Sequence, residues 1–194
     1  MYFKNWKKEI FSIPNLLSLF RIALIPVYVV IYLSATETYQ YVIAAMILAV
    51  SCLTDMIDGK IARHCNMITN LGKILDPFAD KLTQFTLTIC LSLKYPLLIP
   101  VLILFFFKEL FQLIASIINY RKGKVLSGAL LIGKICTTVL FVSLTALVMF
   151  PYLSEKTVEM IAIVDSAFLV LAFIRYIFAF FGKNAKVHDL EKDQ

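Results

Sequence analysis

Charged residues are scarce in this 194-residue chain: Asp, Glu, Lys and Arg together make up only 16% of it, whereas 60% of its residues are hydrophobic. Soluble globular domains average about 25% charged and about 45–50% apolar residues. The composition therefore excludes an ordinary soluble domain and is typical of an integral membrane protein. Cysteine is also sparse, and the four cysteines show no paired spacing, which excludes a disulfide framework or a zinc site. No internal repeat is visible, and the two halves do not resemble each other.

Apolar runs of about twenty residues, the length that crosses a bilayer, occur six times. They predict an all-α, six-helix membrane bundle that forms one domain over 13–181, with a tail at 182–194. The first run is too long for a signal-peptide core of about 7–15 residues, so we expect it to be retained. The segment 1–12 mixes aromatic residues with lysines, which indicates an amphipathic helix on the membrane surface. The expected spans are 13–34, 40–58, 74–94, 97–119, 132–150 and 158–181.

The net charge of +6 could suggest nucleic acid, but in a membrane protein basic residues usually mark cytoplasmic loops and contacts with anionic lipids. On a six-span topology, one side receives little basic charge beyond Lys94 and Lys156. The positive-inside rule then places both termini in the cytoplasm. The basic residues of the other side are Lys4, Lys7, Lys8, Lys60, Arg63, Lys73, Arg121, Lys122, Lys124, Lys134, Lys183 and Lys186.

Four aspartates occur in two spaced pairs at the cytoplasmic ends of the second and third spans. Asp55 and Asp58 are three residues apart and Asp76 and Asp80 four apart, so each pair lies on one face of its helix. The connection between the two helices is short, so the carboxylates should converge. Four like charges would repel one another, and one or two divalent cations would remove that repulsion. Oxygen-only ligands favour hard cations such as Mg²⁺, Mn²⁺ or Ca²⁺.

The residues between the pairs indicate what such a cation would serve. Gly59, Ala62 and Gly72 are small, which lets a ligand approach the helix backbones closely. Arg63 carries a forked donor that suits phosphate. A cation site combined with an arginine and close backbone access is typical of phosphoryl transfer.

These motifs resemble the signature of the CDP-alcohol phosphotransferase family. The segments IPNLLSLFRIALIPVYVV and IGKICTTVLF are also similar to the first and fifth spans of the family's bacterial phosphatidylglycerophosphate synthases. The resemblance covers most of the chain, and every signature position is filled. The signature runs Asp55-x-x-Asp58-Gly59-x-x-Ala62-Arg63, eight residues, Gly72-x-x-x-Asp76-x-x-x-Asp80.

The resemblance implies a homodimer in a bacterial cell membrane. It also implies a cytoplasm-facing site that transfers a phosphatidyl group from CDP-diacylglycerol to an alcohol and releases CMP. It implies that Asp80 deprotonates the acceptor hydroxyl. The implied ligands of two divalent cations, Mg²⁺ or Mn²⁺, are Asp55, Asp58, Asp76 and Asp80. The implied CDP-binding residues are Asp58, Gly59, Ala62, Arg63, Gly72 and Asp76.

The acceptor alcohol is the open part of this interpretation. Phosphatidylglycerophosphate synthases of the family commonly carry Ala-Arg-Glu where this chain has Phe107-Lys108-Glu109, and lysine offers no bidentate fork. We expect glycerol 3-phosphate as the acceptor, with phosphatidylglycerol, the acceptor of a cardiolipin synthase, as the alternative. The candidate acceptor-binding residues are Arg21, Lys108, Arg121 and Lys134.

The charges within the spans allow a second interpretation. Snorkelling or a topology signal explains Arg21, Arg121 and Lys134 equally well. Lys108 and Glu109, as sequence neighbours, are expected to have separate partners. Clustered carboxylates also mark ion pathways, so a divalent cation transporter is the alternative of another class.

Overall fold

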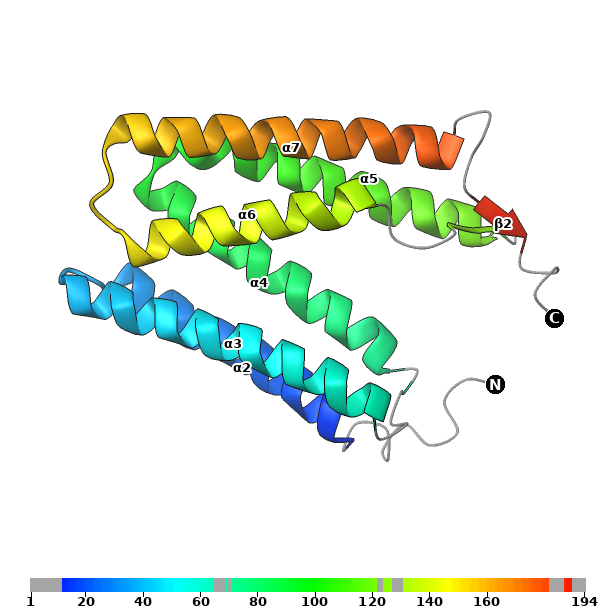
Figure 1. The fold of residues 1–194 in the computed structure, drawn as a ribbon, viewed down its shortest axis with the longest axis horizontal. Coiled ribbons are helices and arrows are strands. Elements are labelled where there is room, and N and C mark those ends of the chain that lie inside the picture. Colours follow the sequence, from blue (N-terminus) through cyan, green and yellow to red (C-terminus); the bar gives the residue numbers. More distant parts are fainter. Residues whose placement is uncertain are drawn as a thin grey trace. The chain divides into compact units, whose positions relative to one another are not determined.

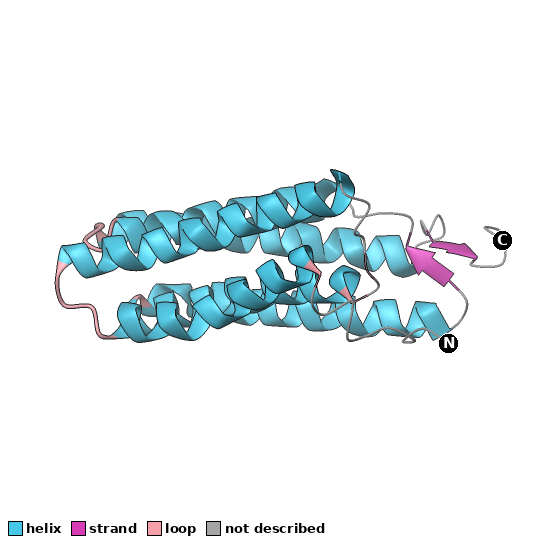
Figure 2. Cartoon of the chain, turned by 90° about the horizontal axis from the view of Figure 1, so that it is seen from below, coloured by secondary structure: helices cyan, strands magenta, loops and turns pink. Residues whose placement is uncertain are grey.

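The structure of the protein is a computed structural model that describes residues 12–64, 69, 71–121, 124–126, 131–181 and 187–189. These residues form six α-helices, one short 3₁₀ turn and two three-residue strands (Figures 1 and 2). The predicted all-α class and the six helices are confirmed. The helices are α2 (Ile13–Leu33), α3 (Thr38–His64), α4 (Gly72–Lys94), α5 (Ile99–Arg121), α6 (Leu131–Met149) and α7 (Glu155–Phe181), with the 3₁₀ turn η1 (Pro96–Leu98) before α5.

Five of the six described helices contain stretches long and apolar enough to cross a membrane, namely α2, the first part of α3, α5, α6 and α7. The sixth, α4, has 23 residues, or about 35 Å at 1.5 Å per residue, so its length would suffice. Its first turns carry Asp76 and Asp80 as well as lysines, which lowers its hydropathy. The prediction of a sixth span therefore stays a prediction.

The largest difference from the expected boundaries is at the end of α3. The sequence predicts that the second span ends at 58 and that Gly59–His64 belong to a connection, but α3 continues to His64. Polar residues such as Lys60 and Arg63 are good helix formers, so the helix extends past its apolar part. The expected amphipathic helix at 1–12 lies almost wholly outside the described residues.

The helix ends follow from local chemistry. Pro14 stands in the first turn of α2, where a missing N–H leaves no hydrogen bond unmade. Before α3, the side-chain oxygen of Gln40 accepts hydrogen bonds from the backbone N–H groups of Thr36 and Glu37, at 2.6 and 3.0 Å. Glu155 in the first turn of α7 complements the helix dipole.

The chain divides into two compact units, which we describe separately. The first runs through Cys90 and includes Thr145–Pro151. In it, α2 and α3 form a hairpin that packs along much of its length (Figure 1). Three tyrosines cluster near the α2–α3 turn. Tyr28 and Tyr32 are stacked with ring centroids 5.5 Å apart, and Tyr32 and Tyr41 meet edge to face with centroids 5.6 Å apart.

The second unit comprises Leu91–Leu144 and Tyr152–Gln194. Here α5 packs on α7, and Phe111, Ala115, Tyr176 and Phe180 form an apolar cluster. Strand β1 (Lys124–Leu126) pairs antiparallel with β2 (Val187–Asp189). The sequence does not predict this pair, because three residues are too few to show the alternation of a strand.

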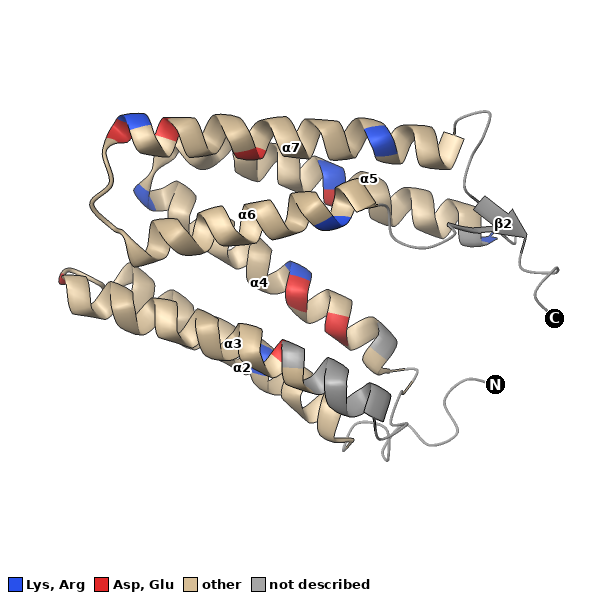
Figure 3. Ribbon diagram, viewed as in Figure 1, with Lys and Arg blue, Asp and Glu red and all other residues tan. Residues whose placement is uncertain are grey.

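The exposed surfaces of the described helices are strongly apolar. Val30 is 66% exposed, Ile163 62% and Phe178 65%. Large apolar patches on a soluble protein would be a liability, whereas on these helices they suit contact with lipid chains. Figure 3 shows the same property as long stretches of helix without a charged residue.

Candidate active site

In the first unit, the aspartates whose side chains the structure describes lie on α3 and α4. Asp55 stands near the end of the apolar part of α3, and Asp76 and Asp80 lie in the first half of α4 (Figure 3). The side chains of Asp55 and Asp80 are 42% and 45% exposed. Nearly half of each of these two side chains is therefore accessible.

Arg21 of α2 joins these two carboxylates. Its Nη2 lies 2.8 Å from Asp55 Oδ1 and its Nη1 lies 2.5 Å from Asp80 Oδ1, while the Arg21 side chain is only 2% exposed. Each terminal nitrogen of one guanidinium thus donates to a carboxylate on a different helix. Charge-assisted bonds of this length are the strong class of protein hydrogen bond.

Two further polar residues of α2 reach the start of α4. Ser18 Oγ donates to Asp76 Oδ1 at 2.5 Å. Asn15 Nδ2 donates to Thr69 Oγ1 at 3.0 Å, and Thr69 Oγ1 also accepts the backbone N–H of Gly72 at 2.9 Å. Asn15 is 1% exposed and Ser18 is fully buried. These two buried polar side chains of α2 are thus hydrogen-bonded to Thr69 and Asp76.

The contacts between α2 and α4 follow a simple register. Positions 15, 18 and 21 of α2 meet positions 72, 76 and 80 of α4 in the same order, so the two helices run parallel. The row on α2 has a spacing of three residues and the row on α4 a spacing of four. Packing an i+3 row against an i+4 row is one of the two common ways in which helices fit together.

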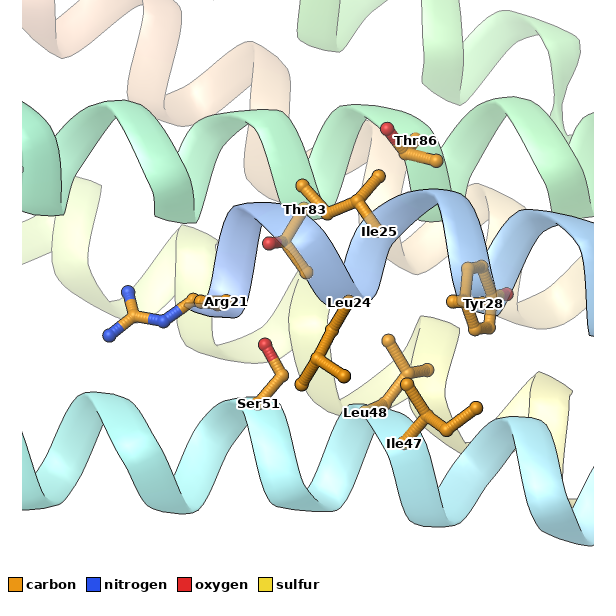
Figure 4. Close-up of a pocket in the computed structure, with 9 residues that line it drawn as sticks. All are labelled: Arg21, Leu24, Ile25, Tyr28, Ile47, Leu48, Ser51, Thr83 and Thr86. Carbon is orange, nitrogen blue, oxygen red and sulfur yellow. The ribbon is translucent and has the colours of Figure 1, made fainter. Parts of the chain in front are cut away.

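An apolar cleft lies directly beside this polar row. It is lined by residues of α2, α3 and α4, and its space suits about one water molecule. Figure 4 shows the Arg21 guanidinium pointing away from the cleft, whose walls include Leu24, Ile25, Ile47 and Leu48. The cleft is too small for a substrate, but it surrounds the stem of Arg21 with apolar groups.

The carboxylates of this site fit a hard divalent cation by their chemistry. Asp55 and Asp80 are nearly half exposed, and the Oδ1 atom of each contacts Arg21. Within the side chains that the structure describes, no three acidic, histidine or cysteine groups stand close enough to hold a metal ion. The backbone of Asp58 lies in α3, but its side chain is outside the described part, so the full set of predicted ligands stays a prediction.

The other predicted site residues lie on α3, on α4 and in the second unit. Gly59, Ala62 and Arg63 belong to the last turns of α3, where the structure describes the backbone only. Gly72 is buried against Asn15. The acceptor candidates Lys108, Arg121 and Lys134 belong to the second unit, where Arg121 and Lys134 are exposed and Lys108 is buried.

The structure corrects one expectation in the second unit. The sequence predicts separate partners for Lys108 and Glu109, but Lys108 Nζ lies 2.6 Å from Glu109 Oε1 and 5.6 Å from the centroid of the Tyr176 ring. The prediction is wrong because a long, flexible lysine stem can fold back to its neighbour even when the two Cα–Cβ bonds diverge. Asp165, which has no role predicted from the sequence, accepts a hydrogen bond at 2.6 Å from Ser143.

The contribution of Asn15 and Ser18 on α2 is not predicted from the sequence. Together with Arg21 they recur every three residues in a span that is otherwise almost wholly apolar. Such spacing places the three on neighbouring turns. That polar row is the signal in the sequence that could have identified them.

The fold and the site define an α-helical membrane protein with several candidate spans and an acidic site formed by α3 and α4. The family model for CDP-alcohol phosphatidyltransferases matches residues 11–179, and the chain belongs to this family of enzymes. It is also similar to two curated proteins named CDP-diacylglycerol--glycerol-3-phosphate 3-phosphatidyltransferase. The one from Bacillus subtilis (strain 168) is 37% identical over 83 residues, and the one from Escherichia coli (strain K12) is 45% identical over 71 residues.

These similarities are partial. Each match covers 37% of this chain, together with 43% of the Bacillus protein and 38% of the Escherichia protein. The chain therefore matches less than half the length of these relatives.

Proposed function

We propose that the protein transfers the phosphatidyl group of CDP-diacylglycerol to glycerol 3-phosphate, forming phosphatidylglycerophosphate and CMP. The observation that carries the proposal is the meeting of Asp55 and Asp80, from two helices, at the buried Arg21 within a chain of this family. Accessible carboxylates can hold the divalent cations that neutralise the charge of a pyrophosphate. The names of the two relatives support the choice of acceptor.

The reaction assigns a distinct role to Asp80. The hydroxyl oxygen of the acceptor attacks the lipid-bearing phosphorus, a new P–O ester bond forms, and the pyrophosphate P–O bond breaks with its electron pair leaving on CMP. The hydroxyl proton passes to the Asp80 carboxylate. Asp80 suits this role because its side chain is 45% exposed and can reach a substrate, as a general base must.

The proposed cation ligands are Asp55, Asp58, Asp76 and Asp80, with Mg²⁺ or Mn²⁺ as the cations. When bound, these cations would neutralise the pyrophosphate charge and favour CMP as the leaving group. The small residues Gly59, Ala62 and Gly72, with Arg63, would border the nucleotide. In this assignment the protein supplies binding, orientation and a proton acceptor.

Charge supports glycerol 3-phosphate over phosphatidylglycerol as the acceptor. The phosphate monoester of glycerol 3-phosphate carries more negative charge than a phosphodiester, and the candidate acceptor residues that the sequence offers, Arg121 and Lys134 among them, are cationic. Lys108 forms an ion pair with Glu109. The presence of a lysine where the family commonly has an arginine is therefore weaker evidence against glycerol 3-phosphate than the sequence alone suggests.

We place the site and both termini on the cytoplasmic side, from the distribution of basic residues, and propose a homodimer by family analogy.

The deciding experiment measures release of labelled CMP from CDP-diacylglycerol by the purified protein, with each acceptor supplied separately. We expect turnover with glycerol 3-phosphate, reversible loss of turnover in excess EDTA, and losses of orders of magnitude in Asp55→Asn, Asp58→Asn and Asp76→Asn. Turnover with phosphatidylglycerol alone would change the acceptor but keep the chemistry. Full activity in EDTA would refute the cation sites, and no CMP release with any alcohol would refute the function.

A further inference from the structure

A row of buried polar side chains runs along α2 beside the acidic site. Asn15 is 1% exposed, Ser18 0% and Arg21 2%. Polar groups so deeply buried in a membrane helix are expensive unless each meets a partner. Here the partners include residues of the family signature and of the turn that precedes α4, namely Thr69, Asp76, Asp55 and Asp80. Ser18 Oγ also lies 3.2 Å from the backbone carbonyl oxygen of Pro14.

We infer that this row, Asn15–Ser18–Arg21, is a positioning element that holds the signature carboxylates in their working geometry. Arg21 is its main member and acts through Asp55 and Asp80, and Ser18 acts through Asp76. The inference rests on the proposed function, because it concerns how these carboxylates are held for that reaction. It replaces the acceptor-binding role that the sequence suggests for Arg21.

The contacts of Arg21 favour positioning over binding of an acceptor phosphate. Both terminal nitrogens already donate to carboxylates at 2.8 and 2.5 Å, and the side chain is 2% exposed. Its stem lies against the apolar cleft of Leu24, Ile25 and Leu48, so the guanidinium would have to leave two carboxylates to turn elsewhere. A phosphate would also have to approach through the negative charge of Asp55 and Asp80.

The geometry also explains why an arginine serves here. Asp55 and Asp80 lie on different helices, and the two ends of one planar guanidinium hold one carboxylate each. A lysine presents a single ammonium on a flexible stem, so it can neutralise the charge without fixing both side chains. Arg21→Lys should therefore lose most of the positioning while it keeps the net charge.

The test uses the full-length protein in detergent, with the variants Arg21→Met, Arg21→Lys and Ser18→Ala. Groups that orient metal ligands typically contribute about 10–100-fold to activity or metal affinity. We expect kcat to fall about 10–100-fold in Arg21→Met and somewhat less in Arg21→Lys and Ser18→Ala. The KM for glycerol 3-phosphate should stay within about twofold of wild type, since positioning acts on the chemical step.

A second readout needs no turnover. The electron paramagnetic resonance spectrum of Mn²⁺ added to the substrate-free protein should differ between wild type and Arg21→Met, because the ligand geometry changes. Failure of the proposed function would appear as wild-type protein that releases no CMP, whatever the variants do. The spectra would then still decide whether Arg21 positions the carboxylates, and an unchanged spectrum would count against it.

Ser143→Ala is the matched control for Ser18→Ala. Both changes remove a serine hydroxyl that donates to an aspartate, at 2.5 Å for Ser18 and 2.6 Å for Ser143, but only Ser18 touches the signature. We expect Ser143→Ala to keep the wild-type kcat at temperatures where it is folded. The inference is overturned if Arg21→Met raises the KM for glycerol 3-phosphate at least tenfold with kcat kept. It is also overturned if Ser18→Ala and Arg21→Met retain the kcat of the control.

Discussion

Replacing Gly72 by alanine tests the contact between α2 and the start of α4. A Cβ at this position would lie 2.7 Å from Asn15 Oδ1 and 3.0 Å from Thr69 Oγ1. Asn15 is 1% exposed and is hydrogen-bonded to Thr69, so it cannot move away without breaking that bond. Overpacking of this kind costs about 1–3 kcal/mol, and a lost hydrogen bond costs about 1 kcal/mol.

We therefore expect Gly72→Ala to lower the free energy of unfolding by about 2 kcal/mol. For a chain of this length that corresponds to a fall of about 4–8 °C in the midpoint of thermal unfolding. The assay is thermal unfolding of the purified protein in detergent, followed by fluorescence. The double variant Asn15→Ala/Gly72→Ala removes the clashing oxygen and should lose clearly less stability than the sum of the two single variants.

Two results would refute this reasoning. One is a Gly72→Ala variant that unfolds at the wild-type temperature. The other is a double variant whose loss equals the sum of the single losses, since additivity would mean that residues 15 and 72 do not interact. A raised KM for CDP-diacylglycerol with an unchanged midpoint would instead indicate that Gly72 serves only the approach of the nucleotide.

Three further predictions concern the base, the topology and the second unit. Asp80→Asn should bind CDP-diacylglycerol nearly as well as wild type yet stop CMP release, and wild-type turnover in this variant would show that Asp80 is not the base. In a cysteine-free background, a cysteine at position 60 in place of Lys60 should be shielded from an impermeant thiol reagent in intact cells. A cysteine in place of Glu37 should react. The reverse labelling pattern would show that the topology is opposite to the one proposed. Ser143→Ala leaves the buried Asp165 carboxylate without its hydroxyl donor, so it should lower the free energy of unfolding by about 1–3 kcal/mol. Asp165→Asn keeps an acceptor oxygen for Ser143 and should lower the midpoint of thermal unfolding less. Equal midpoints for the two variants would contradict this prediction.

The helices could be predicted well from the sequence, because the length of an apolar run can be read directly along the chain and does not depend on tertiary contacts. The first span is expected at 13–34 and α2 is Ile13–Leu33; the last is expected at 158–181 and α7 is Glu155–Phe181. The end of α3 is predicted less well, since hydropathy marks where a bilayer ends and a helix can continue beyond it.

The site could be predicted only in part. Spacing within one helix shows that Asp76 and Asp80 share a face, but it does not show which residue of another helix faces them. Ser18 and Asp76 are separated by 58 residues, and their contact depends on how α2 and α4 are rotated and shifted against each other. The side-chain partner of Asp165 could not be predicted for the same reason. The prediction for Lys108 is wrong because a flexible side chain does not follow the direction of its Cα–Cβ bond.

The parallel register of α2 and α4 limits how far the polar site can extend into the bundle. Three residues advance about 4.5 Å along one helix and four residues about 6 Å along the other, so the two rows drift apart by about 1.5 Å with every contact. At positions 15 and 18 short side chains can still reach their partners near α4. At position 21 the two rows are furthest out of step, and the long side chain of arginine spans the distance. One step further, position 24 is a leucine that lines the apolar cleft. Because the two rows have unequal spacing, their side chains can meet over only a short length of the helices. The difference in spacing therefore limits the depth of the polar region. A single residue inserted in α2 would move the row on α2 out of register with the row on α4.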